Sequence, residues 1–425
     1  NADSVGAGLP GDLLDGLYTA TYHVVSADSH PVSGGITFTI GEPGKDSTAF
    51  TQGKTISELL AESKAGKVTE VAFWADRWVG YLAIALAVGA LAWMLLVWGP
   101  LSNTPGVDRR LVERRFSRLI LISGAAGLLA SLVAIIFQGA IGAGTSFWQA
   151  FGSGIPGEVI HTRFGTVMLV RSVAWLVLIG LVWFGRGRFS RPGPVPVLAC
   201  IAGFALAASS AFAGHASIRD PAWLLIPSDI IHVVAMAVWT GGLAAMLALL
   251  PVATRQLPEP ADRTVLLTRA TLGFSALALA AVALIAVSGS VQAIVEVGSL
   301  PDLIDTQFGR AVLIKIILFA VLIGLGIINR ARIIPGLVRR LERRQSPGAP
   351  GNRLRASLRI EVLLVTVVLG VTAALVSYPP PDAVQSGPAS GDVVVQGKRV
   401  EYTVDPARVG SNEVHLYVFD DRTGA

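Results

Sequence analysis

Charged residues are scarce in this chain of 425 residues. Asp, Glu, Lys and Arg make up 15% of it, hydrophobic residues make up 52%, and the mean hydropathy is +0.61. A soluble globular protein normally has about a quarter of its residues charged. The composition therefore excludes a soluble globular protein and favours one embedded in lipid.

Two chemical features are also missing. The chain has one cysteine, Cys200, which excludes an internal disulfide and leaves the redox compartment undefined. Because Cys200 lies within an apolar run, we expect a small buried side chain there. The phosphate-binding motif G-x-x-x-x-G-K followed by Ser or Thr is absent, so this motif gives no sign that ATP drives the protein.

Long apolar runs are abundant instead. A run of about 20 apolar residues is enough to cross the hydrocarbon core of a bilayer. Eight runs approach or exceed this length, at 78–98, 117–141, 163–184, 195–213, 227–250, 267–297, 311–329 and 359–378. In lipid every backbone polar group must be satisfied internally. We therefore expect an all-α polytopic membrane protein with eight transmembrane helices.

Arginine placement predicts how these runs are oriented. Arginines gather in every second loop, around Arg109, Arg186, Arg263 and the stretch 330–359. The loops on the other side carry Arg163, Arg219 and Arg310. Cytoplasmic loops retain Lys and Arg, so we expect both termini outside the cytoplasm and the spans in the cytoplasmic (inner or plasma) membrane. The net charge of +5 reflects this topology and gives no reason to expect nucleic acid as a partner.

The two ends of the chain read as β-structure. Residues 17–40 alternate as in a hairpin with a turn at Ser29 to Gly35, and strand patterns return at 392–404 and 412–419. No signal peptide opens the chain, so we expect further sequence upstream. The expected units are a partial β-sandwich fragment (1–40), a linker with a short helix at 56–64 (41–76), an eight-helix membrane domain (77–380), a linker (381–391) and a partial extracytoplasmic β-domain (392–425).

Ionisable residues lie inside the apolar runs, at Arg171, Asp229, His232, Glu296, Lys315 and Glu361. Such residues are costly in hydrocarbon and usually face the bundle interior or a polar path. We expect Arg171 to pair with a carboxylate or with backbone carbonyls. Lys315 and Glu361 lie near span ends, from which side chains reach toward the interface.

The fifth run contains the sharpest pattern. Asp229, His232, Met236 and Trp239 follow one another at helical spacing and share one stripe. A carboxylate one turn from a histidine can orient its ring, and a thioether favours Cu(I) over hard cations. The alternative is a packing face on which Met is a filler and Gly241 and Gly242 allow close helix contact.

All six histidines fall on the predicted outer side, at His23, His30, His161, His215, His232 and His415. His215 ends the fourth run, and the connection to the fifth run is short, so His215 emerges at the outer surface near the point where His232 enters. The two rings can then share one metal ion. His161, with Met168 seven residues further on, is a third candidate ligand, although a surface role is the alternative. Asp28 and His30 form a D-x-H pair that suits Cu(II), with turn chemistry before Pro31 as the alternative.

These stretches resemble two copper-resistance families. YTATYHVVSADSHPVSGGITFTI resembles the C-terminal part of the CopC domain, a small periplasmic β-sandwich. The spans resemble CopD, its inner-membrane partner, most specifically in GHA (Gly214–Ala216), DIIHVVAMAVWTGGL (Asp229–Leu243), FGRAVLIKIILFAVLIGLGIINR (Phe308–Arg330) and LRIEVLLVTVVLGVTAALVSYPPP (Leu358–Pro381).

The resemblance implies ligands and a role. In CopC, Cu(II) is held by an amino-terminal histidine and by the D-x-H motif, which Asp28 and His30 match, whereas Asn1 does not match the histidine. CopD implies movement of copper across the cytoplasmic membrane, generally inward. The C-terminal strands resemble a β-domain that follows CopD in some relatives.

The leading hypothesis is a copper transport protein that is not an enzyme. Copper is captured at Asp28 and His30, passes to His215 and His232, and moves past Met236. The copper gradient, cytoplasmic acceptors or proton coupling through Asp229 and Glu361 would drive it. The expected partners are the copper ion and the lipid bilayer, with a cytoplasmic copper chaperone or a homo-oligomer left open.

Two alternatives remain open at this point. A haem-binding membrane redox protein would use the same histidines as axial ligands. A copper chaperone or assembly factor for a respiratory oxidase would bind the metal without moving it across the membrane.

Overall fold

The computed structural model describes residues 16–25, 31–40, 65–214, 220–378, 389–396, 398–405 and 413–420, together with residues 8, 10 and 13. In this part of the chain, eight helical segments are long and apolar enough to cross a membrane. All eight predicted runs are therefore found as helices, and the expectation of a mostly α-helical polytopic protein is confirmed.

The helices extend beyond the apolar runs at several ends. The first begins at Lys67, well before residue 78, because polar residues continue a helix that is longer than its hydrophobic part. In chain order the elements are α2 (Lys67–Ala92), η1 (Trp93–Trp98), η2 (Gly99–Leu101), α3 (Arg109–Gly142), α4 (Phe147–Phe151), α5 (Ile155–Ile160), α6 (Arg163–Phe184), α7 (Pro194–Ala213), α8 (Ala222–Thr254), α9 (Pro260–Val297), α10 (Leu300–Asp305), α11 (Gln307–Ile328), η4 (Asn329–Ile333), α12 (Ile334–Glu342) and α13 (Gly348–Leu375).

Polar caps fix where several of these helices begin. The Asp108 carboxylate accepts the Arg110 backbone N–H at the start of α3. Thr162 and Thr306 do the same for the backbone N–H groups of Gly165 and Gly309 at the starts of α6 and α11. These side chains satisfy donors that a helix cannot satisfy itself, so each span starts at a defined residue.

The strands form two antiparallel sheets. β1 (Gly16–Val25) pairs with β2 (Pro31–Ile40), as predicted for a hairpin. β2 begins at Pro31, so residues 31–35 of the predicted turn belong to the strand. The predicted strand 392–404 is two strands, β3 (Ala389–Val395) and β4 (Lys398–Asp405), because Gln396 adopts a positive φ of 52° that turns the chain. β5 (Glu413–Asp420) pairs with β4.

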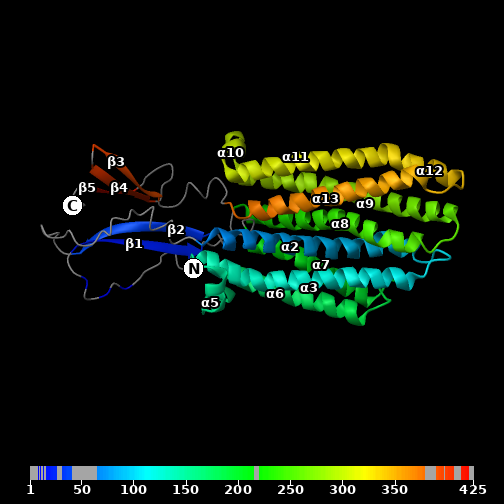
Figure 1. Ribbon diagram of the computed structural model, residues 1–425, viewed down its shortest axis with the longest axis horizontal. Coiled ribbons are helices and arrows are strands. Elements are labelled where there is room, and N and C mark those ends of the chain that lie inside the picture. The colour runs from blue at the N-terminus through cyan, green and yellow to red at the C-terminus, as the bar shows by residue number, and fades with distance from the viewer. Residues whose placement is uncertain are drawn as a thin grey trace.

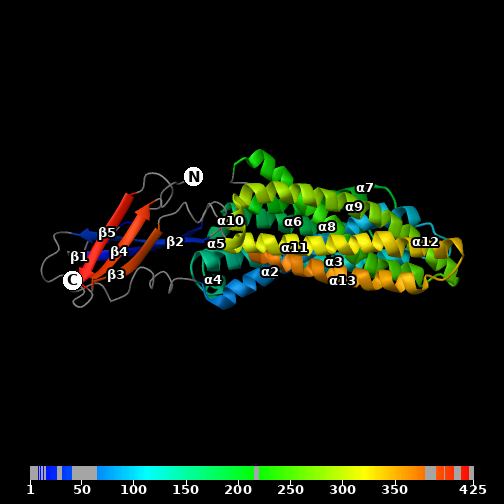
Figure 2. The ribbon, with the colours of Figure 1, turned by 90° about the horizontal axis from the view of Figure 1, so that it is seen from above.

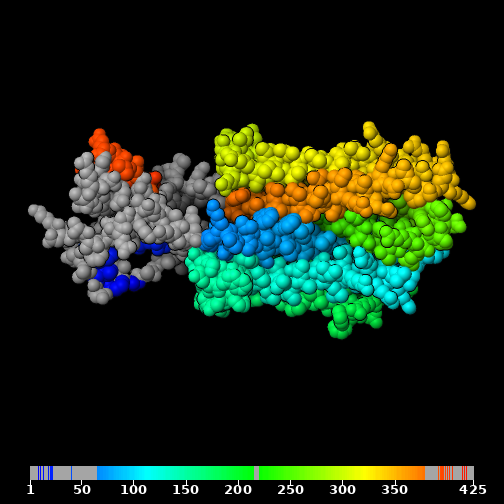
Figure 3. All heavy atoms as spheres, in the orientation of Figure 1, coloured from blue at the N-terminus to red at the C-terminus, as the bar shows by residue number. Residues whose placement is uncertain are grey.

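The bundle has two distinct ends (Figures 1 and 2). The strands lie beyond one end, close to α5 and α10, and we refer to this end as the strand end. The opposite end carries α12, and we refer to it as the α12 end. The space-filling view shows α2, α3, α11 and α13 running side by side between the two ends (Figure 3).

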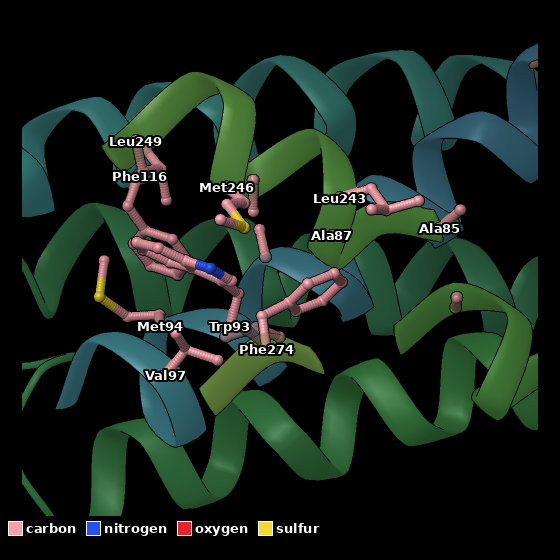
Figure 4. Packing of buried hydrophobic residues seen from close by; sticks show 14 of the residues in the cluster. Ala85, Ala87, Trp93, Met94, Val97, Phe116, Leu243, Met246, Leu249 and Phe274 are labelled. Atoms are coloured by element: carbon pink, nitrogen blue, oxygen red, sulfur yellow. The ribbon is translucent and has the colours of Figure 1, made fainter. Parts of the chain in front are cut away.

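Small and large residues build the core between the helices. Trp93, Met94, Phe116, Met246 and Phe274 pack together toward the α12 end (Figure 4). The outer surface is also apolar, with side chains such as Phe184, Val287 and Phe204 exposed. A helix bundle that is apolar on its outside suits a lipid environment.

Candidate functional site

His232 lies in the strand-end half of α8 and faces α9. Its Nδ1 is 3.1 Å from the Ser288 hydroxyl oxygen, and its ring also interacts with the backbone of Ile285. Gly289 lies against the ring, since a Cβ there would come within 3.2 Å of His232 Cε1. The imidazole is therefore held on one side by a single stretch of α9.

The hydroxyl of Ser288 favours one tautomer of this ring. Ser288 Oγ donates its one hydrogen to the backbone carbonyl of Leu284, at 2.6 Å. It must then accept from His232, so we assign the proton to Nδ1. This leaves Nε2 with a lone pair, which is the form in which imidazole binds metals. Asp229, which the sequence suggested as the orienting partner, is replaced in this role by Ser288.

Two acidic side chains and one basic side chain interact with one another, and the basic one also interacts with this ring. Asp229 on α8 and Glu296 on α9 both interact electrostatically with Lys315 on α11, and Lys315 also acts on His232. All four side chains are half-buried. We call Asp229, Glu296 and Lys315 the acidic lobe, since their formal charges sum to −1. The expectation that Lys315 reaches toward the interface stays a prediction, and the charge of Lys315 interacts with those of two carboxylates.

A second group of charges lies across the bundle on α2 and α6. Arg171 donates from Nε to the Ser209 hydroxyl at 2.8 Å and from Nη2 to that of Ser210 at 3.4 Å. It interacts electrostatically with Asp76, which also interacts with the adjacent Arg77. We call Asp76, Arg77 and Arg171 the basic lobe. The sequence predicted a carboxylate or backbone carbonyls as the partner of Arg171, whereas its hydrogen bonds go to hydroxyl groups on α7 and its interaction with Asp76 is electrostatic.

Tyr81 interacts with residues of both lobes. Its side chain interacts electrostatically with Arg77, Arg171 and Asp229. Asp76 and Arg77 are not among the predicted site residues, because the first apolar run begins at residue 78. The signal was the pair Asp76–Arg77 set between Trp74 and Trp78 at helical spacing, which places two charges on an otherwise apolar helix.

The deeper part of the α8 stripe is packing. Trp239 is 6% exposed and meets Phe319 of α11 edge-on, with the ring centroids 6.0 Å apart. Gly241 packs directly on the backbone of α2 at Ala85, and Gly242 packs on the ring of Phe274. The alternative of a packing face therefore describes this part of the stripe, whereas His232 lies outside it.

Met236 lies between the ring and the packing region. It is half-buried, and its sulfur is 3.5 Å from the Thr240 hydroxyl, whose closer acceptor is the Met236 carbonyl at 2.8 Å. Met236 also packs against the hydrophobic core, as the alternative of a packing face predicts.

The remaining predicted ligands are placed apart or not described. His161 ends α5 and is exposed, whereas Met168 packs with Phe73 and Phe137 in a separate cluster. Asp28, His30 and His215 lie outside the described residues. In the described part of the chain, no three His, Cys, Asp or Glu side chains converge on one metal position.

The α12-end half holds its polar groups differently. The Glu361 carboxylate accepts from Asn329 at 2.6 Å and from Ser357 at 2.9 Å and is 3% exposed. The expectation that Glu361 reaches toward the interface is therefore wrong.

Cys200 is exposed rather than buried, because it lines a largely apolar groove of about 750 Å³ between α7 and the end of the first span.

Comparison with protein families identifies the families that the membrane part of the chain matches. Residues 67–222 match the N-terminal domain of copper resistance protein D-like proteins, and residues 268–375 match copper resistance protein D. Residues 1–41 match the CopC domain. The two membrane matches flank most of α8, which carries His232.

Individual relatives agree with these families. The copper transport protein CutJ of Bacillus subtilis is 30% identical over 416 residues, covering 96% of this chain and 69% of the relative. Copper resistance protein D of Pseudomonas syringae pv. tomato is 25% identical over 307 residues, covering 70% and 97%. The inner membrane protein YebZ of Escherichia coli is 26% identical over 245 residues, covering 57% and 79%. The chain is a member of the CopC/CopD copper-resistance family, as its sequence motifs predicted, and is a copper-related, multi-pass membrane protein.

Proposed function

We propose that this protein transports copper across the cytoplasmic membrane and takes it up at the strand end through His232. The family supports copper as the cargo, and the name of the Bacillus subtilis relative supports transport rather than catalysis. The single observation that carries the proposal is the hydrogen bond between His232 Nδ1 and Ser288, because it leaves Nε2 as a metal-binding lone pair inside a span.

The donors on α8 suit monovalent copper. Asp229 lies about one turn from His232 toward the strand end, and Met236 lies about one turn beyond it in the opposite direction. Imidazole and thioether are ligands that Cu(I) accepts. A site with few strong donors binds its ion transiently, and a transported ion must be able to leave.

His215 is the second imidazole that we propose for this site. α7 ends at Ala213 and α8 begins at Ala222, and the two helices are in contact. The short connection between them starts at the strand end, the same end at which His232 lies. His161 is the third candidate, on the exposed end of α5.

The arginine distribution supports the orientation of the protein in the membrane. Arg109, Arg186 and the stretch 330–359 lie at the α12 end, which we place in the cytoplasm. The strands and both termini are then extracytoplasmic, in small β-domains at each end of the chain. Asp28 and His30, within the CopC match, would capture copper there and deliver it to His232. A cytoplasmic copper chaperone would receive the ion at the α12 end.

The packing below His232 implies a conformational step. Trp239 and Phe319 meet between α8 and α11, and Gly241 packs on α2 without space for an ion. Copper held at His232 therefore faces a closed route toward the α12 end. We propose that α8 and α11 separate at this aromatic pair during transport.

Uptake into sealed vesicles tests the proposal. Purified protein is reconstituted, Cu(I) is supplied under reducing conditions, and metal in the lumen is measured. His232→Ala should abolish uptake and leave the unfolding temperature unchanged. Ile231→Ala, an adjacent and exposed side chain, is the matched control and should transport normally.

Three outcomes contradict the proposal. Unchanged uptake by His232→Ala removes this histidine from the path. Copper binding by the wild-type protein without filling of the lumen indicates a chaperone. A stoichiometric Soret band in the purified protein assigns the histidines to haem iron instead.

A further inference from the structure

The groove that Cys200 lines opens on the outside of the bundle. One wall is α7, along which Val197, Ile201 and Phe204 are exposed, and the other wall is the end of the first span at Leu95 and Pro100. Its volume of about 750 Å³ lies within the range of roughly 300–1,000 Å³ that is usual for small-molecule sites. None of its lining residues belongs to the copper path proposed above.

The groove forms because the two walls touch at one point and leave space at another. Gly203 of α7 packs against the first span, where a Cβ on this glycine would come within 3.3 Å of the Leu91 side chain. Beyond Leu91 the first span continues as the π-helix η1 and the 3-10 turn η2. A π-helical turn within an α-helical span is rare and is frequent at functional sites. The space between the helices lies toward the start of α7.

The walls of the groove suit a hydrocarbon chain. Pro100, Pro192 and Pro196 line it and have no backbone N–H that would need a polar partner. From Pro196 to Phe204 the groove follows α7 for about 12 Å, at 1.5 Å per residue. Half of a hydrocarbon core of ~30 Å is about 15 Å. The groove therefore extends through most of one leaflet.

Arg191 adds a positive charge where the groove reaches the α12 end. The two residues before it are held in place, since Phe189 is buried and the Ser190 backbone N–H donates to Glu113 at 3.2 Å. Glu113 is 2% exposed and pairs with Arg109 on its own helix. Among the residues that the structure describes, Arg191 has no hydrogen-bond or ion-pair partner. Its guanidinium is available to an anion from outside the chain.

We propose that this groove binds one anionic phospholipid of the cytoplasmic leaflet, with an acyl chain between α7 and the first span and the headgroup phosphate on Arg191. Arginine binds phosphate through two parallel N–H groups. Basic pockets between transmembrane helices on the cytoplasmic side bind anionic headgroups. A lipid held there joins α7 to the first span where the two helices are apart. The inference goes beyond copper transport and shares with it only the placement of the α12 end in the cytoplasm.

Lipid binding to the purified full chain tests the proposal. Phosphatidylglycerol, which is anionic, and phosphatidylcholine with the same acyl chains, which is zwitterionic, are titrated into detergent-solubilised protein, and bound lipid is counted by native mass spectrometry. Arg191→Gln removes the charge at the groove, and its control is Arg188→Gln, an exposed arginine outside the groove. Ile201→Trp fills the apolar part, and its control is Leu198→Trp, exposed on the same helix outside the groove.

The charge and the apolar walls should have separable effects. The wild type should bind one phosphatidylglycerol about fivefold more tightly than phosphatidylcholine. Arg191→Gln should bind the two lipids equally, and its fivefold loss for phosphatidylglycerol equals about 1 kcal/mol, the contribution of one arginine near an anionic lipid. Ile201→Trp should bind neither lipid at this site. Both controls should resemble the wild type. Because all four side chains are exposed, the unfolding temperatures without added lipid should not change.

Cys200 offers a second measurement of the same site. It is the one cysteine of the chain and lines the groove, so a maleimide reports on this position alone. Phosphatidylglycerol should slow the labelling of Cys200 at about fivefold lower concentration than phosphatidylcholine does. Arg191→Gln should remove this difference.

Three results overturn the inference. Equal binding of the two lipids by the wild type indicates an ordinary lipid-facing surface. Equal losses in Arg191→Gln and Arg188→Gln assign the preference to the total charge of the connection between α6 and α7. A wild-type dimer that Ile201→Trp dissociates assigns the groove to a second copy of the chain. None of these results bears on copper uptake, which the His232→Ala variant tests separately.

Discussion

The two halves of the bundle contain buried polar groups of the same kinds but hold them in different ways. In the α12-end half, Glu361 is hydrogen-bonded to Asn329 and Ser357, and Glu113 accepts from the backbone N–H of Ser190. Glu361 is satisfied by neutral groups close to it, and the charge paired with Glu113, that of Arg109 at 3.7 Å, belongs to the same helix, α3. In the strand-end half, Asp229, Glu296 and Lys315 interact as charges across three helices.

This difference distinguishes polar groups that stabilise the fold from charges that respond to an added ion. A carboxylate that is satisfied by hydroxyl, amide and backbone donors contributes to packing and changes little when an ion arrives. Charges that compensate one another across helices respond to any added cation, because its charge alters every pair. The strand-end half is therefore the part that we expect to handle copper, and the α12-end half the part that keeps the bundle together.

Two glycines give the sharpest contrast. At Gly241 a Cβ would overlap the Ala85 carbonyl oxygen, and backbone cannot give way, so Gly241→Ala should cost about 3 kcal/mol of stability. At Gly289 a Cβ meets only the His232 ring, which can turn. Gly289→Ala should keep its unfolding temperature and lose about tenfold in copper uptake. Thermal unfolding and vesicle uptake check both, and equal stability losses would contradict the contrast.

The second test compares the loss of one carboxylate from each half of the bundle. Asp229→Asn removes a charge from the acidic lobe and should reduce uptake at limiting copper about a hundredfold, as expected for a charge lost near a half-buried cation. Glu361→Gln keeps an oxygen that accepts from Asn329 and Ser357 and should transport normally. Vesicle uptake of the two variants is compared at matched protein density. A similar loss in Glu361→Gln would instead assign it to proton coupling.

The smallest expected effect concerns the hydroxyl behind the ring. Ser288→Ala removes the acceptor of the Nδ1 proton, and loss of such a supporting hydrogen bond should weaken copper binding about tenfold. Ser131→Ala is the matched control, since its buried hydroxyl donates to the Gly127 carbonyl on α3. Copper affinity is measured with both proteins folded. If both variants bind like the wild type, the tautomer of His232 is not fixed by Ser288.

Much of the architecture was predictable because it follows from local properties of the chain. Apolar runs of sufficient length gave all eight helices, and strict alternation gave the β1–β2 hairpin. Helix ends were less predictable, since α2 begins at Lys67 within a polar stretch. The division at Gln396 was missed because a short turn between similar strands leaves no composition signal.

The order of amino acids alone was enough to predict a helical membrane protein of the copper-resistance family, with His232 inside a span and Asp229 and Met236 about one turn away on the same helix. Tertiary structure decided which neighbour each of these side chains meets. Ser288, rather than Asp229, contacts the ring, and the charge of Lys315 interacts with carboxylates on two other helices. The physical reason is that helical spacing fixes only which residues share a face, whereas packing between helices fixes what that face contacts.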